Sequence, residues 1–226
     1  MTGAQRLFWT AISVASTLVL FAVSYVAFSI GRGDWVAFFQ SPARLAAVVV
    51  SLAICAFVYF CDFGGMNPGK REDRANRWIF GPILVLTIAW AVLPAYLAGR
   101  DRWVSDDAFT PYIGLALLTL GGALRLGAVF VLGQRFTGLV AIQKDHRLET
   151  GSLYRYIRHP SYTGLLMFMA GYVLLFRSWP GLLLVAGTFA ILLARMNAEE
   201  SLLESEFGEE YASYRRRTWR LVPWVY

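Results

Sequence analysis

The chain has few of the residues that form disulfides or transition-metal sites. Its 226 residues include two cysteines, Cys55 and Cys61, and two histidines, His146 and His159. The cysteines lie six residues apart on one predicted helix, which is about 600° of rotation, so they face different directions and do not favour a disulfide. Two cysteines cannot complete a structural zinc site by themselves. We therefore expect no protein-bound metal ion.

The chain also lacks the composition of a soluble domain. Hydrophobic residues make up 57% of it and the mean hydropathy is +0.50, whereas soluble domains average about 45–50% apolar residues. The excess lies in six apolar runs, Leu7–Ile30, Leu45–Phe60, Trp78–Leu97, Tyr112–Leu132, Tyr162–Phe176 and Gly181–Arg195. Because about 20 apolar residues span a bilayer, the sequence predicts an all-α, polytopic transmembrane protein with about six membrane helices. The first run is long for a signal peptide and is interpreted as a retained helix.

Positive charge is concentrated in alternate connections between these runs. The basic connections hold Lys70, Arg71, Arg74 and Arg77, then Arg135, Lys144, Arg147, Arg155 and Arg158, and the tail holds Arg215, Arg216, Arg217 and Arg220. The other connections hold fewer basic residues, accompanied by Asp34, Asp101, Asp106 and Asp107. Since Lys and Arg favour the cytoplasmic side, an alternating path predicts both termini in the cytoplasm. The same distribution favours contact with membrane lipid over nucleic-acid binding.

The last two apolar runs predict a helical hairpin. Each has about 15 residues, or roughly 22 Å of helix, which is shorter than the ~30 Å hydrocarbon core. The segment Arg177–Pro180 between them is typical of a tight turn. Counted outward from this turn, the stretches His159–Tyr162 and Arg195–Glu199 fall at similar distances. We therefore expect the hairpin to return both stretches to the same membrane depth.

Several polar residues near this depth are candidates for chemistry, although each has an ordinary structural interpretation. Arg195 and Glu199 have the i,i+4 spacing of a surface ion pair. The His159–Pro160 dipeptide suits the start of a helix. Tyr154 and Tyr162 could be interfacial aromatic residues.

Taken together, these residues resemble a known pattern. The stretch IQKDHRLETGSLYRYIRHPSYTG, followed after the hairpin by ARMNAEESLLESEFGEEYASYRRRTWRLVP, strongly resembles the isoprenylcysteine carboxyl methyltransferase family. That family belongs to a wider group of integral-membrane methyltransferases that includes phospholipid N-methyltransferases. The resemblance covers residues 134–223. It implies N-terminal transmembrane helices over residues 1–110 and a methyltransferase catalytic region over residues 111–226.

The resemblance also implies a cofactor and its binding residues. The methyl donor would be S-adenosylmethionine, held in a cytoplasm-facing pocket over the final helices. Matching positions assign the cofactor to Gln143, His146, Arg147, Leu148, Glu149, Tyr154, His159, Pro160, Ser161, Tyr162 and Glu199. Arg195 matches the arginine at the reacting end of the substrate, so Arg195 and Glu199 are the expected catalytic pair. Asn197 and Ala198 stand where the family pattern often has acids.

Arg125 is the main ionisable residue expected within the membrane helices. Its position in the fourth apolar run predicts that it lines the cofactor or acceptor cavity, which makes it a candidate substrate-binding residue with Arg195. A transporter or scaffold is the non-enzymatic alternative for such a residue.

The acceptor is expected to be lipophilic or lipid-modified, most simply an isoprenylcysteine-like carboxylate. A carboxylate is already ionised at pH 7, with a reference pKa near 4, so it needs a cation to hold it and no general base. An amine would need a base to remove its proton. A phospholipid amine, a thiol, and a membrane NADPH-dependent sterol-type reductase stay open as alternatives at this point.

Overall fold

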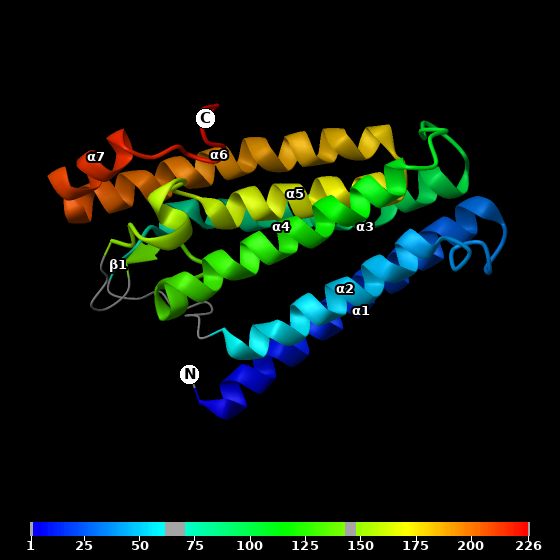
Figure 1. Ribbon diagram of the computed structural model, residues 1–226, viewed down its shortest axis with the longest axis horizontal. Coiled ribbons are helices and arrows are strands. Elements are labelled where there is room, and N and C mark those ends of the chain that lie inside the picture. The colour runs from blue at the N-terminus through cyan, green and yellow to red at the C-terminus, as the bar shows by residue number, and fades with distance from the viewer. Residues whose placement is uncertain (1, 62–70, 143–147, 226) are drawn as a thin grey trace.

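The computed structural model describes residues 2–61, 71–142 and 148–225, and it is a bundle of long antiparallel helices (Figure 1). In the described chain the long helices are α1 (Gly3–Arg32), α2 (Pro42–Phe57), α3 (Phe80–Gly99), α4 (Thr110–Leu132), α5 (Pro160–Leu175) and α6 (Trp179–Phe207). A short helix, α7 (Glu209–Arg216), follows α6. The N- and C-terminal ends both lie toward the end of the bundle that carries β1 and α7.

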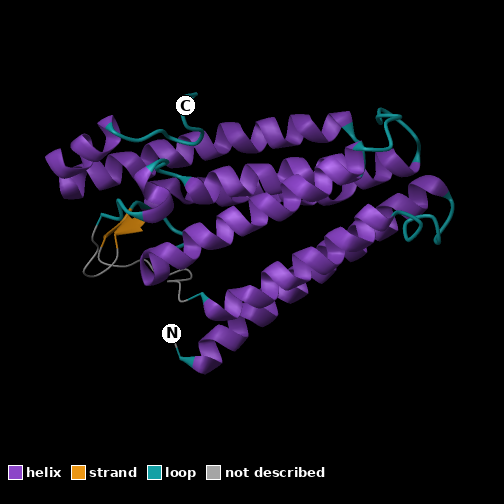
Figure 2. Ribbon diagram, in the orientation of Figure 1, coloured by secondary structure: helices purple, strands orange, loops and turns teal. Residues whose placement is uncertain are grey.

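Short elements at that same end connect the two halves of the chain (Figure 2). Strand β1 (Arg71–Glu72) pairs antiparallel with β2 (Ala141–Ile142), with Glu72 opposite Ala141. The 3-10 helices are η1 (Val58–Phe60), η2 (Arg74–Ile79), η3 (Gly133–Arg135) and η4 (Ser152–Arg155). The β1–β2 pair brings the loop before α3 against the segment after α4. The sequence patterns do not predict this small sheet.

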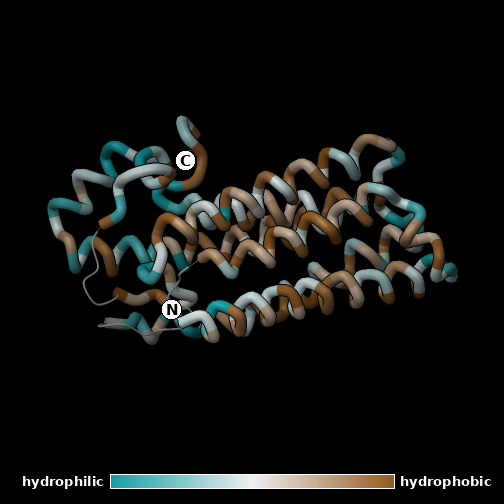
Figure 3. The backbone as a smooth tube through the Cα atoms, turned by 60° about the horizontal axis from the view of Figure 1, so that its bottom comes forward, coloured by the Kyte–Doolittle hydropathy of each residue, from teal (hydrophilic) through white to brown (hydrophobic). Residues whose placement is uncertain are grey.

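The outer surface of the bundle is apolar. Leu183, Val49 and Val85 are 74%, 67% and 66% exposed, and exposed apolar side chains on this scale require lipid around them. Figure 3 shows the hydrophilic stretches gathered at the ends of the bundle, α7 among them. Five described helical segments are long and apolar enough to cross a bilayer, and α5 is a shorter apolar helix. The predicted fold class, an all-α polytopic membrane protein, is confirmed.

Helix α6 is longer than the sixth apolar run predicts. The run ends at Arg195, but the helix continues unbroken to Phe207, 29 residues in all or roughly 43 Å. The continuation is polar on one side, while Leu202 stays buried against Val140 and Ile142. Hydropathy therefore detects only the membrane part of α6, and the remainder carries Glu199 and Glu200 beyond it.

Glycines bring α4 and α5 into close contact. A Cβ atom added to Gly121 would lie 2.4 Å from the backbone nitrogen of Phe168, and one added to Gly164 would lie 2.6 Å from that of Arg125. Gly114 and Gly171 make the same kind of backbone approach about two turns farther along. Small residues of this kind let membrane helices pack backbone to backbone. The contact fixes Arg125 on α4 relative to the start of α5.

We predict that Gly121→Ala destabilises the protein by about 1–3 kcal/mol, because its methyl group would meet backbone that cannot move aside. Gly187→Ala is the matched control, because the nearest atoms to its added Cβ lie 3.9 Å away on the Leu86 side chain. That control should be neutral or stabilising by up to about 1 kcal/mol. Thermal unfolding in detergent measures both, and equal effects of the two variants would contradict the packing argument.

Candidate active site

A cavity of about 390 Å³ lies at the end of the bundle where α3, α4, α5, α6 and α7 approach β2. One part of its wall is polar and includes Arg125, Arg135, Glu149, Tyr154, Arg158, His159, Ser161, Tyr162, Arg195, Glu199, Tyr211 and Tyr214. Another part is apolar and includes Phe80, Ile83, Leu132, Phe136, Leu165 and Leu192. Its volume is in the range of about 300–1,000 Å³ that is typical of small-molecule sites.

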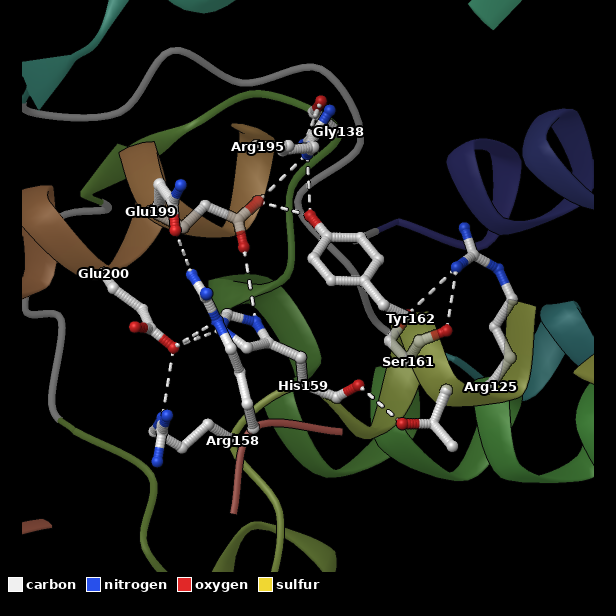
Figure 4. Close-up of polar contacts among 12 residues, drawn as sticks. Arg125, Gly138, Arg158, His159, Ser161, Tyr162, Arg195, Glu199 and Glu200 are labelled. Atoms are coloured by element: carbon white, nitrogen blue, oxygen red, sulfur yellow. Dashed lines mark hydrogen bonds and ion pairs between the residues drawn. The ribbon is translucent and has the colours of Figure 1, made fainter. Parts of the chain in front are cut away.

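Arg195 is buried and anchors three neighbours (Figure 4). Its Nε donates to Tyr162 Oη at 2.7 Å and to Glu199 Oε1 at 3.0 Å, and its Nη2 donates to the Gly138 carbonyl at 2.7 Å. Tyr162 in turn donates to Glu199 Oε1. Among the described residues, Arg195 Nη1 and Glu199 Oε2 have no hydrogen-bond partner. Arg195 can therefore donate a hydrogen bond to a ligand, and Glu199 can accept one.

His159 lies between two carboxylates at the start of α5. Its Nε2 is 3.0 Å from Glu200 Oε1, and its Nδ1 is 3.7 Å from Glu199 Oε2. Its ring stacks on Tyr162 with centroids 5.5 Å apart. Because an ionised Glu200 can only accept a hydrogen bond, the network assigns a proton to Nε2. His159 also precedes Pro160, which is the first residue of α5.

Glu200 is a buried carboxylate surrounded by basic side chains. Besides His159, its Oε1 lies 3.0 Å from Arg158 Nε and 3.2 Å from Arg220 Nε. Burying a charge is costly unless it is paired and hydrogen-bonded, and these three groups meet that condition. The sequence does not reveal this role, because Glu200 begins an acidic run typical of a solvated helix face.

The C-terminal segment forms hydrogen bonds with the residues at the start of α5. The Trp219 and Arg220 carbonyls accept from the backbone N–H groups of Arg158 and His159 at 2.8 and 3.1 Å. The Thr163 hydroxyl donates to the Leu221 carbonyl at 2.8 Å. Residues 219–221 therefore hold the start of α5 from outside the membrane helices.

Arg125 enters the site from α4. Its Nη1 donates to the carbonyl and hydroxyl oxygens of Ser161 at 3.2 and 3.1 Å. No carboxylate of the described ranges lies within ion-pair distance of it. Figure 4 shows Tyr162 between Arg195 and the Arg125–Ser161 pair. Two cations therefore approach Tyr162, and only Arg195 has a carboxylate partner.

Glu149 and Tyr154 line the cavity from the segment before α5. Burial acts to raise the pKa of Glu149, but hydrogen bonds from Arg135 and from the Gly151 backbone N–H hold that pKa below its usual range. Arg135 Nη2 is 2.7 Å from Glu149 Oε2. Burial raises the pKa of Tyr154, whose hydroxyl stays protonated and donates to the Ala128 carbonyl at 3.3 Å. This part of the cavity wall thus offers the carboxylate of Glu149 and the aromatic ring of Tyr154.

The structure places most of the expected site residues together. Those that line the cavity are Arg125, Leu148, Glu149, Tyr154, His159, Ser161, Tyr162, Arg195 and Glu199. Pro160 is buried at the start of α5 and is not part of the cavity wall. Gln143, His146 and Arg147 lie outside the described residues. Within the described ranges, no group of three His, Cys, Asp or Glu side chains has the arrangement of a metal site.

Other lining residues were not expected from the sequence. Phe80 and Ile83 come from α3, and no local motif distinguishes them from other lipid-facing residues. Tyr211 and Tyr214 come from α7, where their i,i+3 spacing next to charged residues is the available signal. The sequence marks Arg135 and Arg158 only as basic residues of a connection between helices.

Comparison with known proteins identifies relatives over most of the chain. Residues 113–205 match the sequence model of the Isoprenylcysteine carboxyl methyltransferase (ICMT) family. The protein-S-isoprenylcysteine O-methyltransferase of Schizosaccharomyces pombe is 36% identical over 237 residues, covering 96% of this chain and 98% of that relative. The protein of that name from Homo sapiens is 32% identical over 214 residues, covering 89% of this chain and 72% of the human one.

A solved structure of the eukaryotic intramembrane Ras methyltransferase ICMT covers 98% of this chain and 94% of its own chain, with 20% identity and a TM-score of 0.46. Sequence similarity is the stronger observation, because the fission-yeast relative matches almost end to end. The protein is thus a multi-pass membrane methyltransferase, and it belongs to the isoprenylcysteine carboxyl methyltransferase family.

Proposed function

We propose that the protein transfers a methyl group from S-adenosylmethionine to the carboxylate of an isoprenylcysteine. The observation that carries this proposal is the pair of arginines at the cavity, Arg195 with an unused Nη1 and Arg125 with no carboxylate partner in the described chain. Relatives named protein-S-isoprenylcysteine O-methyltransferases support the same acceptor.

The residues of the polar wall fit the methyl donor. When bound, S-adenosylmethionine supplies an activated methyl group on a sulfonium cation. Glu199 Oε2 is free to accept hydrogen bonds from its polar groups, and Glu149 offers a second anion. The aromatic faces of Tyr154 and Tyr162 suit a sulfonium through cation–π attraction. We therefore assign cofactor binding to Glu149, Tyr154, His159, Tyr162 and Glu199.

The ion pairs of Glu199 and Glu200 favour a carboxylate acceptor over an amine. Glu199 Oε1 already accepts from Arg195 and Tyr162, and Glu200 is paired with Arg158, Arg220 and the His159 ring. Each is therefore a weaker base toward an amine than an unpaired carboxylate would be. A carboxylate needs no base, and a planar guanidinium can hold both of its oxygens. We assign acceptor binding to Arg195 and Arg125, and catalysis to the Arg195–Glu199 pair.

The apolar wall fits an isoprenyl chain. Ile83, Leu165 and Leu192 come from three different helices and face the same cavity as the two arginines. Phe80, at the start of α3, is 38% exposed and borders this wall. A chain anchored in the bilayer would bury apolar surface here while its carboxylate meets the arginines, with about 0.8 kcal/mol gained per buried CH₂. The names of the relatives do not favour the phospholipid, thiol or reductase alternatives.

The membrane orientation is part of the proposal. Both termini and the cavity occupy the same end of the bundle, which also carries the arginine-rich tail (Figure 1). The excess of Lys and Arg at this end favours the cytoplasm. We propose that residues 111–226 carry the catalytic groups and that the helices of residues 1–110 contribute the apolar wall through α3.

The acceptor assignment predicts a specific product. Purified protein given S-adenosylmethionine with a tritiated methyl group and N-acetyl-S-farnesylcysteine should form a base-labile methyl ester. The carboxamide of the same compound should accept no label, because it lacks the nucleophile. N-acetylcysteine should react with kcat/KM lower by at least about 100-fold, because it buries no isoprenyl chain. Labelling of phosphatidylethanolamine instead of the farnesylated acid would refute the carboxylate assignment.

The two members of the ion pair should affect different steps. Arg195→Gln should lower kcat by about 10²–10³-fold while the Kd for S-adenosylhomocysteine changes by less than about threefold, because Arg195 holds the acceptor. Glu199→Gln should raise that Kd by about tenfold or more, because Glu199 faces the cofactor. Isothermal titration and single-turnover methyl transfer measure the two quantities. Equal loss of cofactor affinity in both variants would contradict the division of roles.

A further inference from the structure

The segment after α7, residues 218–225, exposes large apolar side chains at the end of the bundle that holds the cavity. Trp224 and Val225 are 85% and 78% exposed. The Trp224 ring lies 5.3 Å from the ring of Trp219, so the two tryptophans form one aromatic surface. Tryptophan is enriched where a membrane meets water, because its ring is apolar and its N–H group is polar.

The depth of this segment matches that boundary. Leu221 is buried in a cluster with Leu192 of α6, and the partly buried Leu165 and Leu193 pack against the cluster. These partners belong to the last turns of the apolar part of the hairpin, which ends at Arg195. Figure 1 shows the chain returning from α7 to the side of α6 before it ends. The exposed side chains of the segment therefore lie where the lipid-facing surface of the bundle stops.

Two exposed arginines stand beside the aromatic surface. Ile157 forms a parallel β-bridge with Trp219, whose N–H group donates to the Tyr156 carbonyl at 3.0 Å. Arg155 and Arg217 each precede a bridged residue by two positions, so they lie at the same end of the pairing, and both are exposed. The Arg155 guanidinium is 5.9 Å from the centre of the Tyr156 ring. Arginines next to interfacial aromatic residues favour an anionic lipid surface.

The other side of the same segment faces the site. Arg220, the residue after Trp219, places its Nε 3.2 Å from Glu200 Oε1. The Trp219 and Arg220 carbonyls accept from the backbone N–H groups of Arg158 and His159. Consecutive residues thus join the outer aromatic surface to the ion pairs of the polar wall. A molecule that restrains Trp219 also restrains Arg220 and the start of α5.

We propose that Trp219, Trp224, Arg155 and Arg217 bind the headgroup region of an anionic phospholipid, and that this lipid holds residues 219–221 in the position that favours cofactor binding. A neutral phospholipid accommodates the two tryptophans but does not neutralise the two arginines. The lipid contact stands independently of the proposed function. The effect of the lipid on cofactor affinity rests on that function.

The contact itself is tested by fluorescence in phospholipid nanodiscs. The emission of Trp224 is the difference between the wild type and Trp224→Phe. Phosphatidylcholine brominated on its acyl chains should quench this difference emission, because quenching by bromine requires close approach within the bilayer. Iodide dissolved in the water should quench it only weakly. Strong quenching by iodide without quenching by brominated lipid would overturn the proposal, because Trp224 would then face water.

The effect on the site is tested by isothermal titration with S-adenosylhomocysteine, which has no net charge near pH 7 and is not concentrated by a charged membrane. Wild-type protein should bind it about 3- to 10-fold more tightly in nanodiscs with about one-third phosphatidylserine than in phosphatidylcholine alone. Arg155→Gln/Arg217→Gln should reduce this difference to less than about twofold, and its affinity in phosphatidylcholine alone should equal that of the wild type.

Arg215→Gln/Arg216→Gln is the matched control, because it removes the same charge from neighbouring exposed arginines. Arg215 and Arg216 pair with Glu204 and Glu209 at 3.7 and 2.7 Å, away from the aromatic surface in the pairing pattern. This control should keep the wild-type response to phosphatidylserine. An equal loss of the response in both double variants would overturn the assignment, because net charge alone would then explain it.

Two further outcomes separate this inference from the proposed function. Equal wild-type affinity for S-adenosylhomocysteine in the two lipid mixtures would overturn the link between the lipid and the site. Failure of the wild type to bind S-adenosylhomocysteine in either mixture at millimolar concentration would refute the proposed function and the cofactor effect with it. The quenching of Trp224 decides the lipid contact in either case.

Discussion

Two consecutive carboxylates, Glu199 and Glu200, leave the membrane region on α6, and their neutralisation organises the rest of the site. Glu199 is paired by Arg195 one turn earlier on its own helix, whereas Glu200 is paired by Arg158 and Arg220 from other segments. A buried charge without such partners would cost several kcal/mol. The start of α5 and the C-terminal tail must therefore meet at α6, and this meeting encloses the cavity.

The close approach of α4 and α5 determines how near Arg125 lies to the start of α5. Gly121 and Gly164 allow contact at backbone distance, so the Arg125 guanidinium can reach Ser161 at the first turn of α5. A larger residue at either glycine would move the two helices apart. The separation between the two arginines is thus controlled by helix packing in the membrane, at positions that touch no ligand.

The sequence predicts the helices well and the site in part, for physical reasons. Hydropathy detects membrane burial, so it finds the six apolar runs but stops at Arg195, where α6 continues as a polar helix. Helical spacing predicts that His159 and Glu199 return to one depth, and their ring-to-carboxylate distance of 3.7 Å agrees. Local patterns cannot reveal that Glu200 is buried or that Phe80 and Tyr211 reach the cavity, because those facts depend on long-range packing.

The balance of charged groups around the cavity also determines which charge the acceptor can carry. The acidic groups described at or beside the polar wall have basic partners: Arg135 for Glu149, Arg195 for Glu199, and Arg158 with Arg220 for Glu200. Arg125 is the described cation of the wall that lacks a carboxylate. An anionic acceptor would complete this balance, whereas a cationic one would add to the excess of positive charge. Recognition of a carboxylate and the pairing of the described carboxylates with arginines are therefore two consequences of one arrangement.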